Sequence, residues 1–416
     1  MRRQAALALL LLAAGWAATL WVSPWSDERV NDLFVYRVFA EPVVGGALPY
    51  RDVFLEYPPL AAPTIALPGL AGTGEEVFRA AFAGWTLLVA AAVILLCGAL
   101  AARTGGDVRR ALLAAVLMPL LCGALVRTHF DLAPVALLLG GLLLLAGGRP
   151  RSGMAVLGLA AMTKGFPLVA APVALAWLAT RTDRRTLLQS ATALLAALAI
   201  PAAAALAISP SGTLDAVTYH LERPVQIESL PASGLLLLDQ LGLGEAESVN
   251  SHRSDGLEHE AAGVATGVAL AAMLGVLAVL TVGGRRGGPR ELALASLAAV
   301  AAFAALGKVL SPQYMLWLVP LGALAFAWRL HALAAAVAVA AVLTQVEFPA
   351  RYFDLVDGDP FPVAVVALRN LVLIAVLILA LRALVPLRSR QDLLDRQRPP
   401  APVALDEDRV QPRVLV

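Results

Sequence analysis

The sequence predicts an all-α polytopic membrane protein, and two features of its composition support that prediction. Of its 416 residues, 59% are hydrophobic and only 15% are charged, whereas roughly 25% of residues are charged in an average soluble protein. The apolar residues form long runs, and a helix needs about 20 such residues to cross a bilayer. The runs do not alternate apolar and polar residues, as the strands of a transmembrane barrel would.

The first apolar run follows Arg2 and Arg3 and extends to Ser23. A cleaved signal peptide is the alternative interpretation, but the apolar core of a signal peptide usually has about 7–15 residues. Because this run is longer, we expect a retained first span with its N-terminus in the cytoplasm.

Arginine clusters divide the remainder of the chain, since basic residues concentrate in cytoplasmic loops. We therefore expect a transmembrane domain over 1–387 with about twelve helices, followed by a disordered cytoplasmic tail over 388–416. The protein would lie in the cell membrane with both termini in the cytoplasm. The predicted spans are 5–23, 77–100, 111–127, 132–147, 153–164, 166–180, 187–208, 261–282, 291–307, 313–330, 332–346 and 363–383.

The segment 58–72 contains four prolines in a short apolar run. If it crossed the membrane, every later loop would change sides and the basic clusters would become external. We predict a juxtamembrane or re-entrant segment, which is tolerated at membrane depth only where protein or a wet cavity surrounds it.

With this topology the polar connections fall on the external face, and the two largest are 24–60 and 209–260. The stretch 25–60 alone carries six carboxylates, three arginines and seven aromatic residues. Such a concentration of chemistry at one membrane edge favours an enzyme that acts at the external leaflet.

Several other features have plainer interpretations. Cys97 and Cys122 lie in apolar runs and are expected to be core residues. Arg127 and Asp131 could form a structural ion pair. The histidines and acids of 245–260 match no metal-ligand spacing and are expected in a solvated loop, whereas 234–244 could be an interfacial helix. The sequence shows no basic patch that would indicate nucleic-acid binding.

Three groups of external residues share a pattern with a known family. They are the loop motifs Asp32-x-x-x-Tyr36, Gly45-Gly46-Ala-Leu-Pro49-Tyr50-Arg51-Asp52 and Glu56-Tyr57-Pro58-Pro59; the segments Lys164-Gly-Phe-Pro167 and Tyr219–Ser229; and Ser311-Pro312-Gln313-Tyr314 running into Trp317. Together they resemble GT-C glycosyltransferases that use polyprenyl-phosphate sugars, with glycosyltransferase family 87 and its mannosyltransferases the closest branch.

The resemblance implies an inverting transfer of a sugar, with mannose expected, onto a hydroxyl of a cell-envelope glycolipid or glycan. Asp32 would be the catalytic general base, because it occupies the position where the GT-C pattern carries its catalytic aspartate. The alternative is a helix N-cap. No cofactor and no divalent metal is predicted; the expected partners are the lipid-linked donor, the acceptor and membrane lipid.

The remaining candidate residues divide between the two substrates. Acceptor or sugar contacts are expected from residues of the first loop, although the tyrosines could belong to an interfacial aromatic belt and Asp52 could simply pair with Arg51. These residues are Tyr36, Tyr50, Asp52, Glu56 and Tyr57.

The donor phosphate needs cations or hydrogen-bond donors. Arg223 offers a planar fork suited to phosphate, but Glu222 or Glu228 could neutralise it, and Lys308 could instead extend to the lipid headgroups. The family often carries histidine near Gln313, and its absence here leaves the donor sugar open. The donor-phosphate candidates are Lys164, His220, Arg223, Lys308, Gln313 and Tyr314.

Three other functions compete with this one. An arabinofuranosyl or other lipid-phosphate sugar could be the donor. A lipid or polysaccharide transporter or flippase would be a different class, but transporters place charged groups near the midplane of broken spans, and the predicted span interiors are almost free of charge. A non-catalytic assembly subunit would have no need of Asp32.

Overall fold

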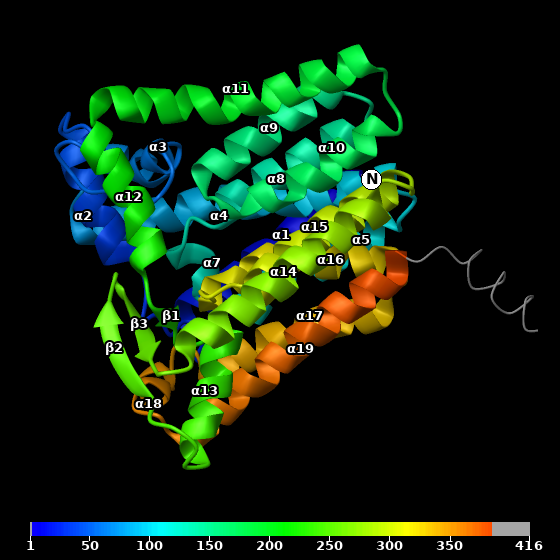
Figure 1. Ribbon diagram of the computed structural model, residues 1–416. Helices are drawn as coiled ribbons and strands as arrows, with labels where there is room; N and C mark the ends of the chain where they lie inside the picture. The colour runs from blue at the N-terminus through cyan, green and yellow to red at the C-terminus, as the bar shows by residue number, and fades with distance from the viewer. Residues whose placement is uncertain (1, 385–416) are drawn as a thin grey trace, which may run out of the picture. The chain divides into compact units, whose positions relative to one another are not determined.

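The computed structural model describes residues 2–384, so the tail predicted at 388–416 lies outside the described residues. The described chain is mainly helical (Figure 1). Its longest apolar helices are α1 (Arg2–Trp21), α4 (Glu75–Arg103), α11 (Arg184–Ile208), α14 (Ala262–Gly284), α15 (Pro289–Leu306) and α19 (Pro360–Leu384).

Within residues 2–384, these six helices are long and apolar enough to cross a membrane. Shorter helices occupy most of the other predicted spans, and the all-α polytopic class is confirmed, whereas the number of twelve spans stays a prediction. The shorter helices are α8 (Leu132–Ala146), α9 (Pro150–Thr163), η2 with α10 (Phe166–Ala170, Ala171–Ala179), η3 with α16 (Pro312–Tyr314, Met315–Ala327) and α17 (His331–Glu347).

The span predicted at 111–127 is wrong as a single helix. It is divided into α5 (Val108–Ala115), α6 (Met118–Cys122) and α7 (Leu125–Thr128). Gly123 has a φ of 55°, a left-handed conformation that glycine adopts without steric cost and that ends the helix before it. The break turns the following residues into the interior, where Arg127 and Asp131 are both buried.

The segment 58–72 forms two short elements, α3 (Ala61–Ala66) and the 3₁₀ helix η1 (Leu67–Ala71). Pro68 lies in the first turn of η1, where a missing backbone N–H costs nothing. Leu60 donates its backbone N–H to the Met162 carbonyl of α9 at 2.9 Å. The prolines thus keep this segment short and folded back against the helices.

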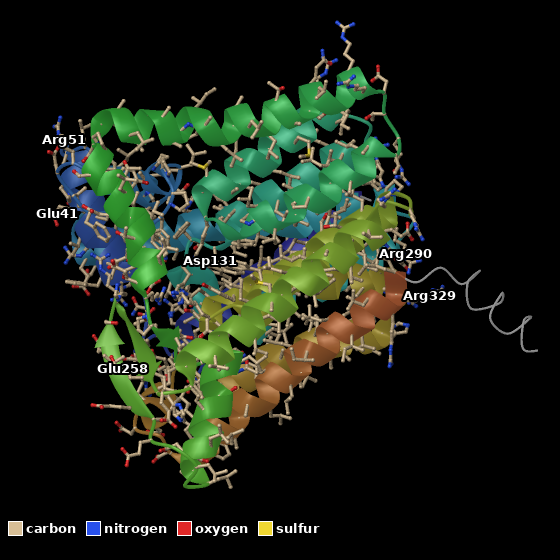
Figure 2. The ribbon with its side chains drawn as sticks, in the orientation of Figure 1. Glu41, Arg51, Asp131, Glu258, Arg290 and Arg329 are labelled. Carbon is tan, nitrogen blue, oxygen red and sulfur yellow. The ribbon has the colours of Figure 1, made fainter. Side chains whose placement is uncertain are left out.

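The polar connections gather at one end of the helices (Figure 1). They contribute α2 (Leu33–Val44), α12 (Pro210–Glu222), α13 (Leu230–Gln240), α18 (Tyr352–Val356) and three strands: β1 (Val225–Gln226), β2 (Glu247–Ser251) and β3 (Ser254–Glu258). Figure 2 shows Arg290 and Arg329 at the opposite end from Glu41, Arg51 and Glu258. The separation of polar loops from basic loops follows the pattern that the sequence predicted.

The small sheet is a departure from the solvated loop expected at 245–260. Its strands are antiparallel in the order β1-β3-β2, and Ser251 pairs with Ser254 across a two-residue turn. Leu257 of β3 is buried and joins an apolar cluster with Val225, Leu236 and Val363. This apolar contact anchors the hairpin against α13 and α19.

Candidate active site

A cavity of about 1000 Å³ lies at the polar end of the helices. Its wall is assembled from segments far apart in the sequence: the start of α2, the loop before α3, the turn between α7 and α8, the end of α12, the β2–β3 turn and the loop before η3. Ten of the twelve candidate residues line it: Asp32, Tyr50, Glu56, Tyr57, Lys164, His220, Arg223, Lys308, Gln313 and Tyr314. Tyr36 and Asp52 do not.

Asp32 stands at the N-cap position of α2, yet its side chain makes no capping hydrogen bond. Instead, Oδ2 accepts the Tyr36 hydroxyl at 3.0 Å, and His129 Nε2 lies 3.4 Å from the same oxygen. Burial, and then the charge of Asp32, raises the pKa of Tyr36 well above its usual value, so the phenol remains a donor. Asp32 is therefore held in place while it faces the cavity.

The tyrosines of the first loop do not form an exposed aromatic belt. Tyr36 and Tyr50 are buried, and the Tyr50 hydroxyl donates to the Tyr57 backbone carbonyl at 2.6 Å. Tyr36 stacks on Phe82, with ring centroids 5.4 Å apart. Their first role is to hold the loop that presents Glu56 and Tyr57 to the cavity.

Asp52 lies outside the cavity lining and pairs with Arg51, which was the alternative to a substrate contact. Its carboxylate accepts hydrogen bonds from the side chain of Arg51 at 2.9 and 3.0 Å and from the backbone N–H of Leu48 at 2.8 Å. The Arg51 hydrogen bond lowers the pKa of Asp52. Nothing in this arrangement directs Asp52 towards the other candidate residues.

The predicted ion pair between Arg127 and Asp131 is wrong, because each residue has another partner. Arg127 pairs with Glu28 and donates Nε to the Thr19 carbonyl at 2.9 Å. Asp131, fully buried, accepts Lys164 Nζ at 2.7 and 2.8 Å. The broken helix at Gly123 accounts for the difference, since it directs the two residues to different neighbours.

An aromatic stack packs beside the Asp131–Lys164 pair. The ring of Trp317 lies between Phe166 and Tyr314, with centroid distances of 3.9 and 3.6 Å. Its Nε1 donates to Asp131 Oδ1 at 2.6 Å. The stack thus fixes the direction in which the Lys164 ammonium meets the cavity.

Arg223 and Lys308 form a second cationic wall. Lys308 Nζ donates to the backbone carbonyls of Leu221 and Arg223 at 2.8 Å each, and Arg223 Nε donates to Ser254 Oγ at 3.1 Å. Burial, and then the charge of Arg223, lowers the pKa of Lys308. Within residues 2–384 neither cation has a carboxylate in salt-bridge distance.

Glu228, one of the two carboxylates that could neutralise Arg223, is engaged elsewhere. Glu228 pairs with Arg369 of α19 at 3.2 Å, and both side chains are almost completely buried. Asn370 donates to the Glu228 carbonyl and to Ser233 Oγ, both at 3.1 Å. This network joins the segment after β1 to α19 and leaves Arg223 facing the cavity.

The tip of the β2–β3 hairpin was missed by the sequence analysis. His252 and Arg253 occupy the two-residue turn with φ values of 51° and 53°, and both line the cavity. Such turns favour Asn-Gly or Asp-Gly, whereas here Asp255-Gly256 lies in β3 and the turn itself carries neither dipeptide. Arg253 lies 3.6 Å from Glu56, whose Oε2 has no hydrogen-bond partner within the described chain.

The burial of His220 should make the stability of the protein depend on pH. Its Nε2 donates to the Glu56 carbonyl at 2.7 Å, and burial lowers its pKa. The unfolded chain would take up a proton near pH 6.5 before the folded chain does, so the free energy of unfolding falls as pH drops through that range. His220→Gln should reduce the loss of thermal stability between pH 7.5 and 5.5; an equal loss in both proteins would contradict it.

The fold is that of a polytopic membrane protein with a large cavity at one end of its helices. Residues 54–312 match Glycosyltransferase family 87, so the chain belongs to this family and is a glycosyltransferase. No curated protein matches the chain. Among solved structures, the apo crystal structure of the Archaeoglobus fulgidus oligosaccharyltransferase is similar with a TM-score of 0.45 and 15% identity. That match covers 96% of this chain and 58% of the other, so this chain spans less than two thirds of that protein.

Proposed function

We propose that this protein is an inverting glycosyltransferase that transfers a sugar, with mannose as the expected sugar, from a polyprenyl phosphate to a hydroxyl of a cell-envelope glycolipid or glycan on the external face. The observation that supports it is the composition of one cavity, which is lined by the carboxylate of Asp32 and by the cations Lys164, Arg223 and Lys308. A base and a phosphate site are the two requirements of this reaction.

Asp32 would act on the acceptor. As the acceptor oxygen attacks the anomeric carbon, its proton passes to the Asp32 carboxylate, and the bond from that carbon to the phosphate oxygen breaks. A single displacement inverts the anomeric centre and needs one carboxylate as base. The Tyr36 hydroxyl, 3.0 Å from Oδ2, would hold the carboxylate in the orientation that accepts the proton.

The cations would act on the leaving group. The electron pair of the broken bond stays on the phosphate, and fixed positive charges stabilise it more in a buried site than in water. The phosphate leaves without a general acid. Arg223 is the best candidate for direct contact, because its guanidinium is free of carboxylates within the described residues and can bind two phosphate oxygens.

The apolar part of the cavity supports a lipid-linked donor. It is bounded by side chains of four helices, and α11 and α14 among them bury only 11% of their apolar windows. Helices with so little protein contact are expected to face lipid. These cavity-lining residues are Met162, Ala202, Thr266, Leu270, Met273 and Phe303.

Removal of the Arg223 charge should weaken the use of the donor. Arg223→Gln is expected to lower kcat/KM for the donor by about 10–100-fold, since charge-assisted hydrogen bonds contribute about 1.5–3 kcal/mol. The matched control is Arg51→Gln, because Arg51 is outside the cavity lining and forms an exposed ion pair with Asp52, and such pairs contribute little to stability. Equal kinetics in the two variants would remove Arg223 from the phosphate site.

The direct test uses the full chain in membranes with synthetic polyprenyl-phosphate mannose and polyprenyl-phosphate arabinofuranose. Release of polyprenyl phosphate and sugar transfer to extracted glycolipid or glycan are both measured. Mannose transfer is the expected result. Transfer of arabinofuranose alone would correct the sugar, and folded protein that turns over neither donor would contradict the proposed function.

A further inference from the structure

His129 is the neighbour of Asp32 whose role is not yet explained. It lies in the buried turn between α7 and α8, with a side chain that is 3% exposed, and its Nε2 is 3.4 Å from Asp32 Oδ2. This separation is a close polar contact and falls short of a well-formed hydrogen bond. The ring also lines the cavity, so it can respond to what happens at Asp32.

The hydrogen bonds of Thr128 determine which ring nitrogen carries the proton. The Thr128 hydroxyl donates to the Ala124 carbonyl at 2.9 Å, and the same oxygen is 2.9 Å from His129 Nδ1. A hydroxyl has a single proton, so towards the ring it accepts, and Nδ1 must donate. In the neutral ring, Nε2 is then unprotonated and presents a lone pair to Asp32.

The surroundings favour the neutral form of this ring. Burial is the main cause that lowers the pKa of His129, and Lys164 acts in the same direction. The charges of Asp32 and Asp131 oppose them, and Tyr36 occupies the same Asp32 oxygen as a donor. In the neutral form with Nδ1 protonated, two acceptors, Nε2 and Oδ2, face each other at 3.4 Å.

We propose that His129 is the proton acceptor behind Asp32, an inference that rests on the proposed function. The acceptor hydroxyl gives its proton to the Asp32 carboxylate as the new glycosidic bond forms and the bond to phosphate breaks. The proton then passes from Asp32 to His129 Nε2. The carboxylate is restored, and the imidazolium lies beside both Asp32 and Asp131.

The tautomer can be tested without any turnover. The chain has five histidines, and ¹⁵N spectra of the histidine-labelled full chain in nanodiscs, compared with His129→Gln, identify the signals of His129. Above pH 7.5 we expect a protonated Nδ1 and an unprotonated Nε2. A proton on Nε2 would overturn the proposal, because that nitrogen could not then accept one from Asp32.

The pH–rate profile separates proton transfer from a structural role. His129→Gln should lower donor turnover by about 10²-fold and move the acid limb to lower pH, because a carboxyl group alone ionises at lower pH than a pair that contains imidazole. Thr128→Val, which frees the tautomer and keeps the histidine, should reduce the rate less. A slower His129→Gln enzyme with an unmoved acid limb would overturn the proposal.

Asp32→Asn in the same assay shows which statement fails. If that variant is inactive and the acid limb of His129→Gln is unmoved, the proton acceptor is rejected and the proposed function stands. If Asp32→Asn turns over the donor at the wild-type rate, the base assignment fails, and the role of His129 fails with it.

Discussion

Asp32→Asn is expected to reduce glycosyl transfer by about 10²–10⁴-fold, the range over which a positioned acid or base contributes. The amide keeps the size of the carboxylate and can still accept the Tyr36 hydroxyl, so the local fold should persist. What it loses is the ability to take a proton. Transfer is measured with saturating donor in membranes, with the protein content of each sample normalised.

Two controls make the result specific. Asp52→Asn alters a carboxylate of the same loop that is outside the cavity lining, and its activity should stay within about twofold of wild type, as for other exposed pairs. Tyr36→Phe removes only the hydrogen bond to Asp32 and should give an intermediate loss. Full activity of Asp32→Asn would contradict the assignment of the base.

Arg369→Met is expected to cause the largest loss of stability, about 3–5 kcal/mol, because it leaves a buried carboxylate without its partner. Glu228 would lose the ion pair at 3.2 Å. Glu347, whose two side-chain oxygens have no hydrogen-bond partner within the described chain, would lose the nearby positive charge of Arg369 that stabilises its carboxylate. Thermal unfolding in detergent measures the loss.

The double variant Arg369→Met with Glu228→Gln supplies the control. Removal of both charges ends the penalty of an isolated buried ion, so the double variant should recover much of the stability that the single variant loses. Losses that simply add would show that Arg369 contributes through packing alone.

The sequence predicted the membrane fold and much of the cavity wall for the same physical reason. Polar side chains near the ends of apolar runs are excluded from the apolar middle of the spans and therefore gather at the helix ends. Asp32, Lys164 and Arg223 do line one cavity there. The order of the elements along the chain was sufficient to place them at one membrane edge.

Pairings inside that edge could not be predicted, because they depend on tertiary geometry. The positive φ of Gly123 separates Arg127 from Asp131, and no local pattern announces which lysine Asp131 will meet. The hairpin of His252 and Arg253 lacks the glycine or asparagine that signals such a turn. Arg369 is fully buried and pairs with Glu228, which lies 141 residues away in the sequence, a partner that no local pattern indicates.

The exposed faces of α11 and α14 beside the cavity have a kinetic consequence. A lipid donor seated between them would reach the site by moving in the plane of the bilayer, without passing through water. Its effective concentration would then be a mole fraction among lipids, and dilution with inert phospholipid would slow the enzyme even at constant bulk concentration. The apparent affinity for such a substrate would depend on the lipid composition of the membrane as well as on the protein.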